Sequence, residues 1–150
     1  MTRLLFVCLG NICRSPTAEA VFRGRAKAAG HQVLVSSAGT MDWHVGKHPD
    51  PRAIAAAAKR GYQMSRLQAQ VVQVSDFSEF DYILAMDRQN LADLEQIYPG
   101  TGTRPRLFLD YATHTGQFEV PDPYYGGEDG FSEVLDLIEA ASDGLLSTFD

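Results

Sequence analysis

The stretch FVCLGNICRSPTAEA joins a predicted strand directly to a predicted helix. The apolar run from Leu4 to Cys8 is typical of a buried strand, and SPTAEAVFRGRAKAAG, which opens with Ser15 and Pro16, is typical of a helix. The turn between them therefore leads from the end of a strand into the N-terminus of a helix. This is the connection from which α/β folds are built.

Strand and helix signals alternate along the rest of the chain. Three further strands are predicted, at Val33–Ser37, Tyr82–Met86 and Arg106–Leu109. Helices are predicted at 51–61, at 88–97 and from about Phe131 towards the C-terminus. The alternation predicts a parallel sheet with helices on both faces, in which ligands bind at the carboxyl ends of the strands. The turn after Cys8 falls at such an end.

Length and charge narrow the function classes. A chain of 150 residues with 45% hydrophobic residues fits a single domain with a real core. Its net charge of −6 argues against a nucleic-acid surface, which needs clustered Lys and Arg. The early apolar run is too short for a secretory signal, and no segment has the length of a membrane span. We therefore expect a cytoplasmic protein with reduced thiols that binds neither nucleic acid nor membrane.

The turn after Cys8 has the features of an anion site. A helix N-terminus offers unpaired N–H groups and a partial positive charge, and phosphate is its usual ligand. A cysteine at the base of such a turn, with Arg14 beside it, favours the thiolate, which is a nucleophile. The planar guanidinium of Arg14 can bind two oxygens of a phosphate.

Two other interpretations of the turn remain open at this point. A cysteine at the end of a buried strand can be only a small apolar residue. Cys8 and Cys13 could also bind a metal together with His44 and His48, although these four residues come from two loops and nothing else supports a site. We expect neither a metal nor another cofactor.

Three motifs together resemble the low-molecular-weight protein tyrosine phosphatases. They are VCLGNICRSPTAE near the N-terminus, SSAGTMDWHVGKHPDPRA in the first third, and VPDPYYGG in the last third. The resemblance covers nearly the whole chain, 1–150, as one domain. It implies a three-layer α/β fold with a four-stranded parallel sheet and a phosphate-binding loop after the first strand. It also implies metal-free dephosphorylation of phosphotyrosine, with tyrosine-phosphorylated proteins, including tyrosine kinases, as partners and phosphate as product.

The resemblance assigns roles to individual residues. Cys8 matches the nucleophile that becomes a phosphocysteine, Arg14 the clamp on the phosphate, and Asp122 the general acid and base, for which Asp129 and Glu128 are alternatives. The backbone amides of the turn complete the phosphate site, and further residues brace the turn, form the walls of the crevice or support the site. The turn residues are Leu9, Gly10, Asn11, Ile12 and Cys13; the bracing residues are Asn11 and Ser15; the wall residues are Trp43, Tyr124 and Tyr125; the supporting residues are Ser36 and Asp87.

Two positions depart from the family pattern. Leu67 stands where a histidine often supports the active site, so a hydrogen bond to the turn is expected to be missing or replaced. Met41 stands where glycine is common, which predicts a changed substrate rim. Two rival functions remain: an arsenate reductase, which would need further cysteines, and a binding module without activity.

The two cysteines also suggest redox chemistry. Peroxide should oxidise the Cys8 thiolate to a sulfenic acid, and Cys13 in the same turn could trap it as a disulfide and so prevent irreversible oxidation. The alternative is that Cys13 only packs the turn against the helix.

Overall fold

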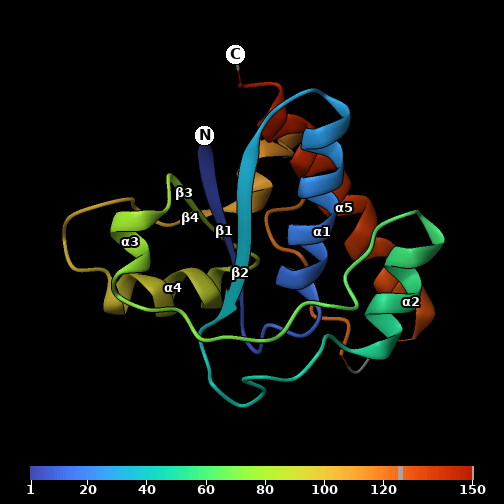
Figure 1. Cartoon of the computed structure of the whole chain (residues 1–150), viewed down its shortest axis with the longest axis horizontal. Helices are drawn as coiled ribbons and strands as arrows, with labels where there is room; N and C mark the ends of the chain where they lie inside the picture. Colours follow the sequence, from blue (N-terminus) through green and yellow to red (C-terminus); the bar gives the residue numbers. More distant parts are fainter. Residues whose placement is uncertain (125–126, 150) are drawn as a thin grey trace.

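Four parallel strands form the centre of the molecule, in the order β2-β1-β3-β4 (Figure 1). They are β1 (Thr2–Cys8), β2 (Val33–Gly39), β3 (Tyr82–Ala85) and β4 (Arg106–Leu107). The computed structural model describes residues 1–124 and 127–149, including their side chains except that of Glu128. The predicted α/β fold with a four-stranded parallel sheet is confirmed.

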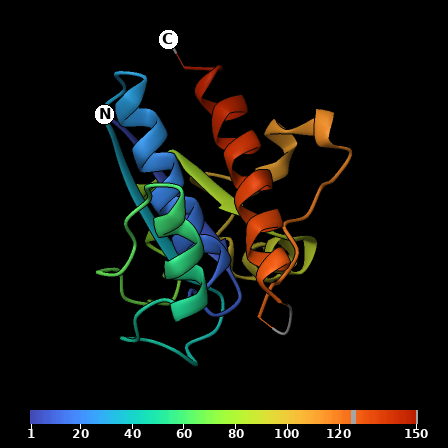
Figure 2. The same ribbon diagram turned by 90° about the vertical axis from the view of Figure 1, so that its right-hand side faces the viewer.

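Helices cover both faces of the sheet. One face carries α1 (Arg14–Ala28) and α5 (Glu128–Leu146), with α2 (Pro51–Lys59) packed against both helices (Figure 2). The other face carries α3 (Asp76–Glu79) and α4 (Arg88–Ile97), on the left in Figure 1. The sheet is therefore the middle of three layers, as expected.

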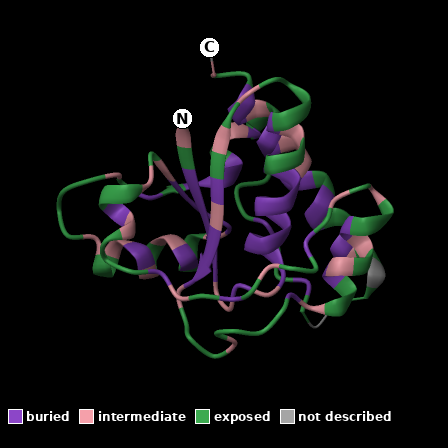
Figure 3. Cartoon of the chain, viewed as in Figure 1, coloured by how far each residue is buried: buried purple, intermediate pink, exposed green. Residues whose placement is uncertain are grey.

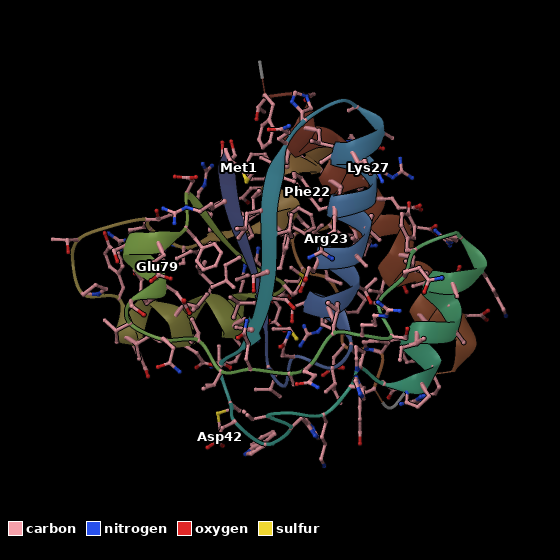
Figure 4. All side chains as sticks on the ribbon, viewed as in Figure 1. Met1, Phe22, Arg23, Lys27, Asp42 and Glu79 are labelled. Carbon is pink, nitrogen blue, oxygen red and sulfur yellow. The ribbon has the colours of Figure 1, made fainter. Side chains whose placement is uncertain are left out.

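From Leu4 onwards the strand β1 has no solvent face, which explains the unbroken apolar sequence from Leu4 to Cys8. Leu4, Phe6 and Cys8 point into the core under α1 and α5, whereas Leu5 and Val7 point into the smaller core under α3 and α4. Figure 3 shows the resulting buried band through the centre of the molecule. Figure 4 labels Phe22 on α1, whose ring centroid lies 5.7 Å from that of Phe6. Each such buried side chain contributes about 1.5–3 kcal/mol to stability.

The segment that contains β4 is shorter as a strand than the sequence predicts. The strand predicted at Arg106–Leu109 ends at Leu107, because β3 ends at Ala85 and offers no partner beyond the pair Ala85–Leu107. The chain continues as two 3-10 helices, η1 (Phe108–Tyr111) and η2 (Thr113–Thr115). These short helices occupy part of the connection between β4 and α5, and α5 starts at Glu128 instead of at about Phe131 as predicted. The short helix α3 was not predicted.

All four strands point the same way, so the loops that follow them meet at one edge of the sheet, at the bottom of Figure 1. The loop after β2, marked by Asp42 in Figure 4, is joined to the turn after β1 by two backbone hydrogen bonds. Thr40 N–H donates to Cys8 O at 3.0 Å, and Met41 N–H donates to Leu9 O at 3.0 Å. Within the described residues, no helix has the length and apolar character needed to cross a membrane.

Candidate active site

The turn of residues 9–13, which we call the phosphate loop, connects Cys8 at the end of β1 to Arg14 at the start of α1. Asn11 has φ of 59°, in the left-handed region that only a short polar side chain or glycine enters readily. Such a residue lets successive N–H groups face one side of a turn, as an anion site requires. Gly39 at the end of β2 leaves room for the loop, because a Cβ there would lie 2.7 Å from Leu9 O.

A chain of hydrogen bonds leads from Gln70 to the sulfur of Cys8. The backbone N–H of Gln70 donates to Asn11 Oδ1 at 2.9 Å, which fixes the orientation of the Asn11 amide. Asn11 Nδ2 therefore donates to Ser15 Oγ at 2.8 Å. The Ser15 hydroxyl can then donate to Cys8 Sγ at 2.9 Å or to Ala38 O at 3.4 Å, and a Cys8 thiolate would be the nearer, charged acceptor. A donated hydrogen bond of this kind stabilises the thiolate more than the thiol.

The same amide also reaches a buried carboxylate. Asn11 Nδ2 makes a second hydrogen bond, to Ser37 Oγ at 3.0 Å, and Ser37 Oγ donates to Glu19 Oε1 at 2.7 Å. Ser37 is thus the strand serine that contacts Asn11. Ser36 accepts a hydrogen bond from the Gln70 side chain at 3.0 Å instead. Sequence reasoning missed Ser37, Glu19 and Gln70, although the paired serines of SSAG were a usable signal.

Arg14 is buried and oriented from two sides. Its Nη1 donates to Asp87 Oδ2 at 2.6 Å and to Val120 O at 3.1 Å. Burial alone would lower the pKa of Arg14, but the charge of Cys8 and the hydrogen bond to Asp87 raise it above its ordinary value. Asp87 also caps α4 by accepting the N–H of Asn90 at 2.7 Å. The structure therefore places Asp87 against Arg14, where the prediction put a supporting residue.

Asp122 approaches the phosphate loop from the other end of the chain. Val120 N–H donates to Met86 O at 2.8 Å, which fixes the segment before Asp122 beside the end of β3. The Asp122 Oδ2 atom then lies 3.7 Å from Arg14 Nη2, and Oδ1 accepts the N–H of Tyr124 at 3.0 Å. The carboxylate remains about half exposed, so it is accessible to solvent and to a molecule bound in the pocket.

A pocket with a volume of about 180 Å³ opens above Cys8. Residues of the phosphate loop line it, together with Trp43, Tyr124 and His44. Trp43 and Tyr124 are two of the residues expected to form the walls of the crevice, whereas sequence reasoning considered His44 only as a metal ligand. A Cβ on Gly10 would lie 2.8 Å from His44 Cδ2, so this glycine allows the imidazole to pack on the loop. Tyr125 lies outside the described residues. Asp129 lines a separate groove between α2 and α5.

The two departures from the family pattern have distinct outcomes. Leu67 packs in the apolar cluster around Cys13 and Met64 and makes no side-chain hydrogen bond to the loop. Gln70, three residues further on, contacts Asn11 through its backbone N–H. Met41 is exposed on the loop after β2. Among the described residues, no group of three or more His, Cys, Asp or Glu side chains could hold a metal ion.

Cys13 is buried and lines the same pocket as Cys8. Burial, followed by the charges of Asp50 and Cys8, raises the pKa of Cys13 to about 12. At neutral pH the side chain is therefore a thiol and not a competing thiolate. Both cysteines line the pocket, and it is the sulfur of Cys8 that shares a hydrogen bond with the Ser15 hydroxyl.

Comparison with known proteins places this site in a family. The family model for low molecular weight phosphotyrosine protein phosphatases matches residues 3–150. A low molecular weight protein-tyrosine-phosphatase of Streptomyces coelicolor is 48% identical over 97% of this chain and 92% of its own length. A low molecular weight phosphotyrosine protein phosphatase of Schizosaccharomyces pombe is 44% identical over 97% and 96%. The crystal structure of a protein tyrosine phosphatase from Entamoeba histolytica, with Hepes in its active site, superposes with a TM-score of 0.94 at 41% identity, covering 98% and 96% of the two chains.

Proposed function

The chain belongs to the low molecular weight phosphotyrosine protein phosphatases, which are phosphoric monoester hydrolases, and we propose that Cys8, Arg14 and Asp122 carry out its reaction. Cys8 is the nucleophile, Arg14 the phosphate clamp, and Asp122 the general acid and base. One observation supports this proposal most strongly. Residues that are far apart in the sequence line a single pocket, with Arg14 Nη2 and Asp122 Oδ2 only 3.7 Å apart.

In the first step the Cys8 thiolate attacks the phosphorus of phosphotyrosine. The S–P bond forms as the P–O bond to the tyrosine ring breaks, and Asp122 gives its proton to the departing oxygen. The hydroxyl of Ser15 and the amides of the phosphate loop stabilise the sulfur and the equatorial oxygens. Arg14 binds two of these oxygens while the phosphoryl group is transferred.

In the second step water hydrolyses the phosphocysteine. Asp122, now a carboxylate, takes a proton from the water whose oxygen attacks phosphorus. The S–P bond breaks, its electron pair returns to Cys8, and phosphate leaves. Ser15 again donates to the thiolate as it re-forms, so the same hydrogen bond assists both steps.

Tyrosine-phosphorylated proteins are the substrate class that follows from family membership. We extend the proposal to an autophosphorylated tyrosine kinase as one natural partner, and to one catalytic domain spanning residues 1–150. The rim residues Trp43 and Tyr124 would contact the tyrosine ring of the substrate. A thiolate nucleophile requires a reducing compartment, so we place the enzyme in the cytoplasm.

Release of p-nitrophenol from p-nitrophenyl phosphate tests the mechanism. Cys8→Ser should show no turnover while it still binds vanadate, and EDTA should leave the wild-type rate unchanged. Asp122→Asn should lower kcat/KM for poor leaving groups by roughly 10²–10⁴-fold. Activity in Cys8→Ser, or inhibition by EDTA, would contradict the thiolate mechanism. Reduction of arsenate, or phosphopeptide binding without hydrolysis, would support a rival function instead.

A further inference from the structure

Arg52, in the first turn of α2, reaches across to the segment that contains Asp122. Its Nη2 donates to Tyr124 O at 2.8 Å, and its guanidinium lies over the rings of Tyr124 and Phe131, at 5.6 and 5.1 Å from their centroids. The N–H of the same Tyr124 donates to Asp122 Oδ1 at 3.0 Å. The residue that Arg52 holds by its carbonyl therefore holds the carboxylate of Asp122 by its N–H.

The other side of Arg52 is tied to the phosphate loop. Its Nε and Nη2 bind the two carboxylate oxygens of Asp50 at 3.1 and 2.9 Å. The backbone N–H of Asp50 donates to Ile12 O at 2.8 Å, and the Asp50 side chain is only 8% exposed. The hydrogen bond from Arg52 lowers the pKa of Asp50, so the pair stays charged at neutral pH. A continuous path thus runs from Ile12 through Asp50 and Arg52 to Tyr124.

Two arginines hold the segment 120–124 at positions that are symmetric about Asp122. Arg14 binds Val120 O, two residues before Asp122, and Arg52 binds Tyr124 O, two residues after it. Between these points the Asp122 side chain is about half exposed, and its Oδ2 atom forms an ion pair with Arg14 Nη2 at 3.7 Å. Among the described residues, the carboxylate is held by Arg14 and by the N–H of Tyr124. Its position relative to Cys8 matters, because a shift of about 1 Å in a reacting group can cost about 100-fold in rate.

We propose that Arg52 is a positioning residue for proton transfer, which acts through Tyr124 to hold the Asp122 carboxylate over the phosphate loop. The inference rests on the roles proposed above for Cys8 and Asp122. Arg52 itself touches no reacting atom. Without the Arg52 side chain, residues 122–124 could move away from the phosphate loop. The Asp122 carboxyl group would then be within reach of the leaving oxygen in a smaller fraction of enzyme–substrate complexes.

The test compares kcat/KM for two substrates, because this constant reports only on steps up to the first P–O cleavage. Phenyl phosphate needs a proton on its leaving oxygen, whereas 2,4-dinitrophenyl phosphate does not. Arg52→Ala should lose roughly 10- to 100-fold with phenyl phosphate and less than about 3-fold with the dinitrophenyl ester. Arg52→Lys, which keeps one donor, should recover part of the loss. Arg60→Ala is the matched control, since Arg60 follows the same helix but pairs with Asp136 and Glu139 of α5.

A double-mutant comparison makes the test specific for Asp122. In an Asp122→Asn background, adding Arg52→Ala should change kcat/KM for phenyl phosphate by less than about 2-fold, because the two residues act as one unit. Equal losses with both substrates, or an additive loss in the double variant, would overturn the inference and assign Arg52 to substrate binding or stability. If Asp122→Asn itself showed no extra loss with phenyl phosphate, the proposed acid would be wrong, and the role of Arg52 would fall with it.

Discussion

Asp87 serves two purposes at once, and a pair of substitutions separates them. Its Oδ2 atom binds the buried Arg14 at 2.6 Å, and its Oδ1 atom caps α4 through the N–H of Asn90 at 2.7 Å. Asparagine is as good a helix cap as aspartate but carries no charge. Asp87→Asn should therefore remove the ion pair alone, whereas Asp87→Ala should remove both the ion pair and the cap.

The expected loss of stability follows from the burial of Arg14. The side chain of Arg14 is 4% exposed and that of Asp87 is 22% exposed. Removing one partner of a buried ion pair costs about 3–5 kcal/mol. Since Asp87 is partly open to solvent, and Val120 O at 3.1 Å remains bound to Arg14, we expect about 2–3 kcal/mol for Asp87→Asn. The lost cap should add about 1 kcal/mol in Asp87→Ala.

Urea unfolding in phosphate-free buffer measures these differences, and kcat/KM should fall in both variants by about 10-fold or more because Arg14 loses its orientation. Glu95→Gln is the control, since Glu95 pairs with Arg104 on the surface and such a pair contributes at most about 1 kcal/mol. The reasoning would be refuted if Asp87→Asn stayed within about 0.5 kcal/mol of wild type while Asp87→Ala lost about 1 kcal/mol. In that case the cap alone would matter.

Two further predictions concern pH. Because the pKa of Cys13 is raised to about 12, the fraction of Cys13 present as thiolate increases between about pH 7 and about pH 9. Its attack on oxidised Cys8 should therefore be faster at the higher pH, and a dithiol should then restore the activity of peroxide-treated enzyme more completely. Full recovery of Cys13→Ser, without a linked Cys8–Cys13 peptide by mass spectrometry, would make Cys13 purely structural. Burial alone would raise the pKa of Glu139, but hydrogen bonds from Tyr62, Arg25 and Arg60 lower this pKa below its ordinary value of 4.5. The stability that the Glu139 carboxylate contributes is therefore complete above pH 4.5 and is lost as the pH falls below 4.5. Glu139→Gln should accordingly lose less stability than wild type on acidification in a thermal-unfolding series, and equal losses would contradict this assignment.

Local sequence patterns were sufficient to predict those elements whose structure depends on residues that are neighbours in the chain. Asp50 and Pro51 predicted the start of α2, and the Asp50 side chain does accept the N–H of Arg52 at 2.8 Å. The apolar run ending at Cys8 predicted a strand with both faces buried. The end of β4 could not be predicted in the same way. RLFL has strand character throughout, but the length of its neighbour β3 decides where pairing stops.

The sequence by itself therefore determined the α/β fold, through the alternation of strand and helix signals, and the phosphate loop between Cys8 and Arg14, because these depend on local patterns. The reaction class followed from the resemblance of three separate motifs to a known family. Only the tertiary structure decided which distant groups complete the site. The register of β2 against β1 brings Ser37, and not Ser36, to Asn11, since adjacent strand residues face opposite sides of a sheet. Arg14 meets Val120 across 106 residues, and Arg52 meets Tyr124 across 72. Contacts over such separations depend on how the layers pack, which no short stretch of sequence encodes.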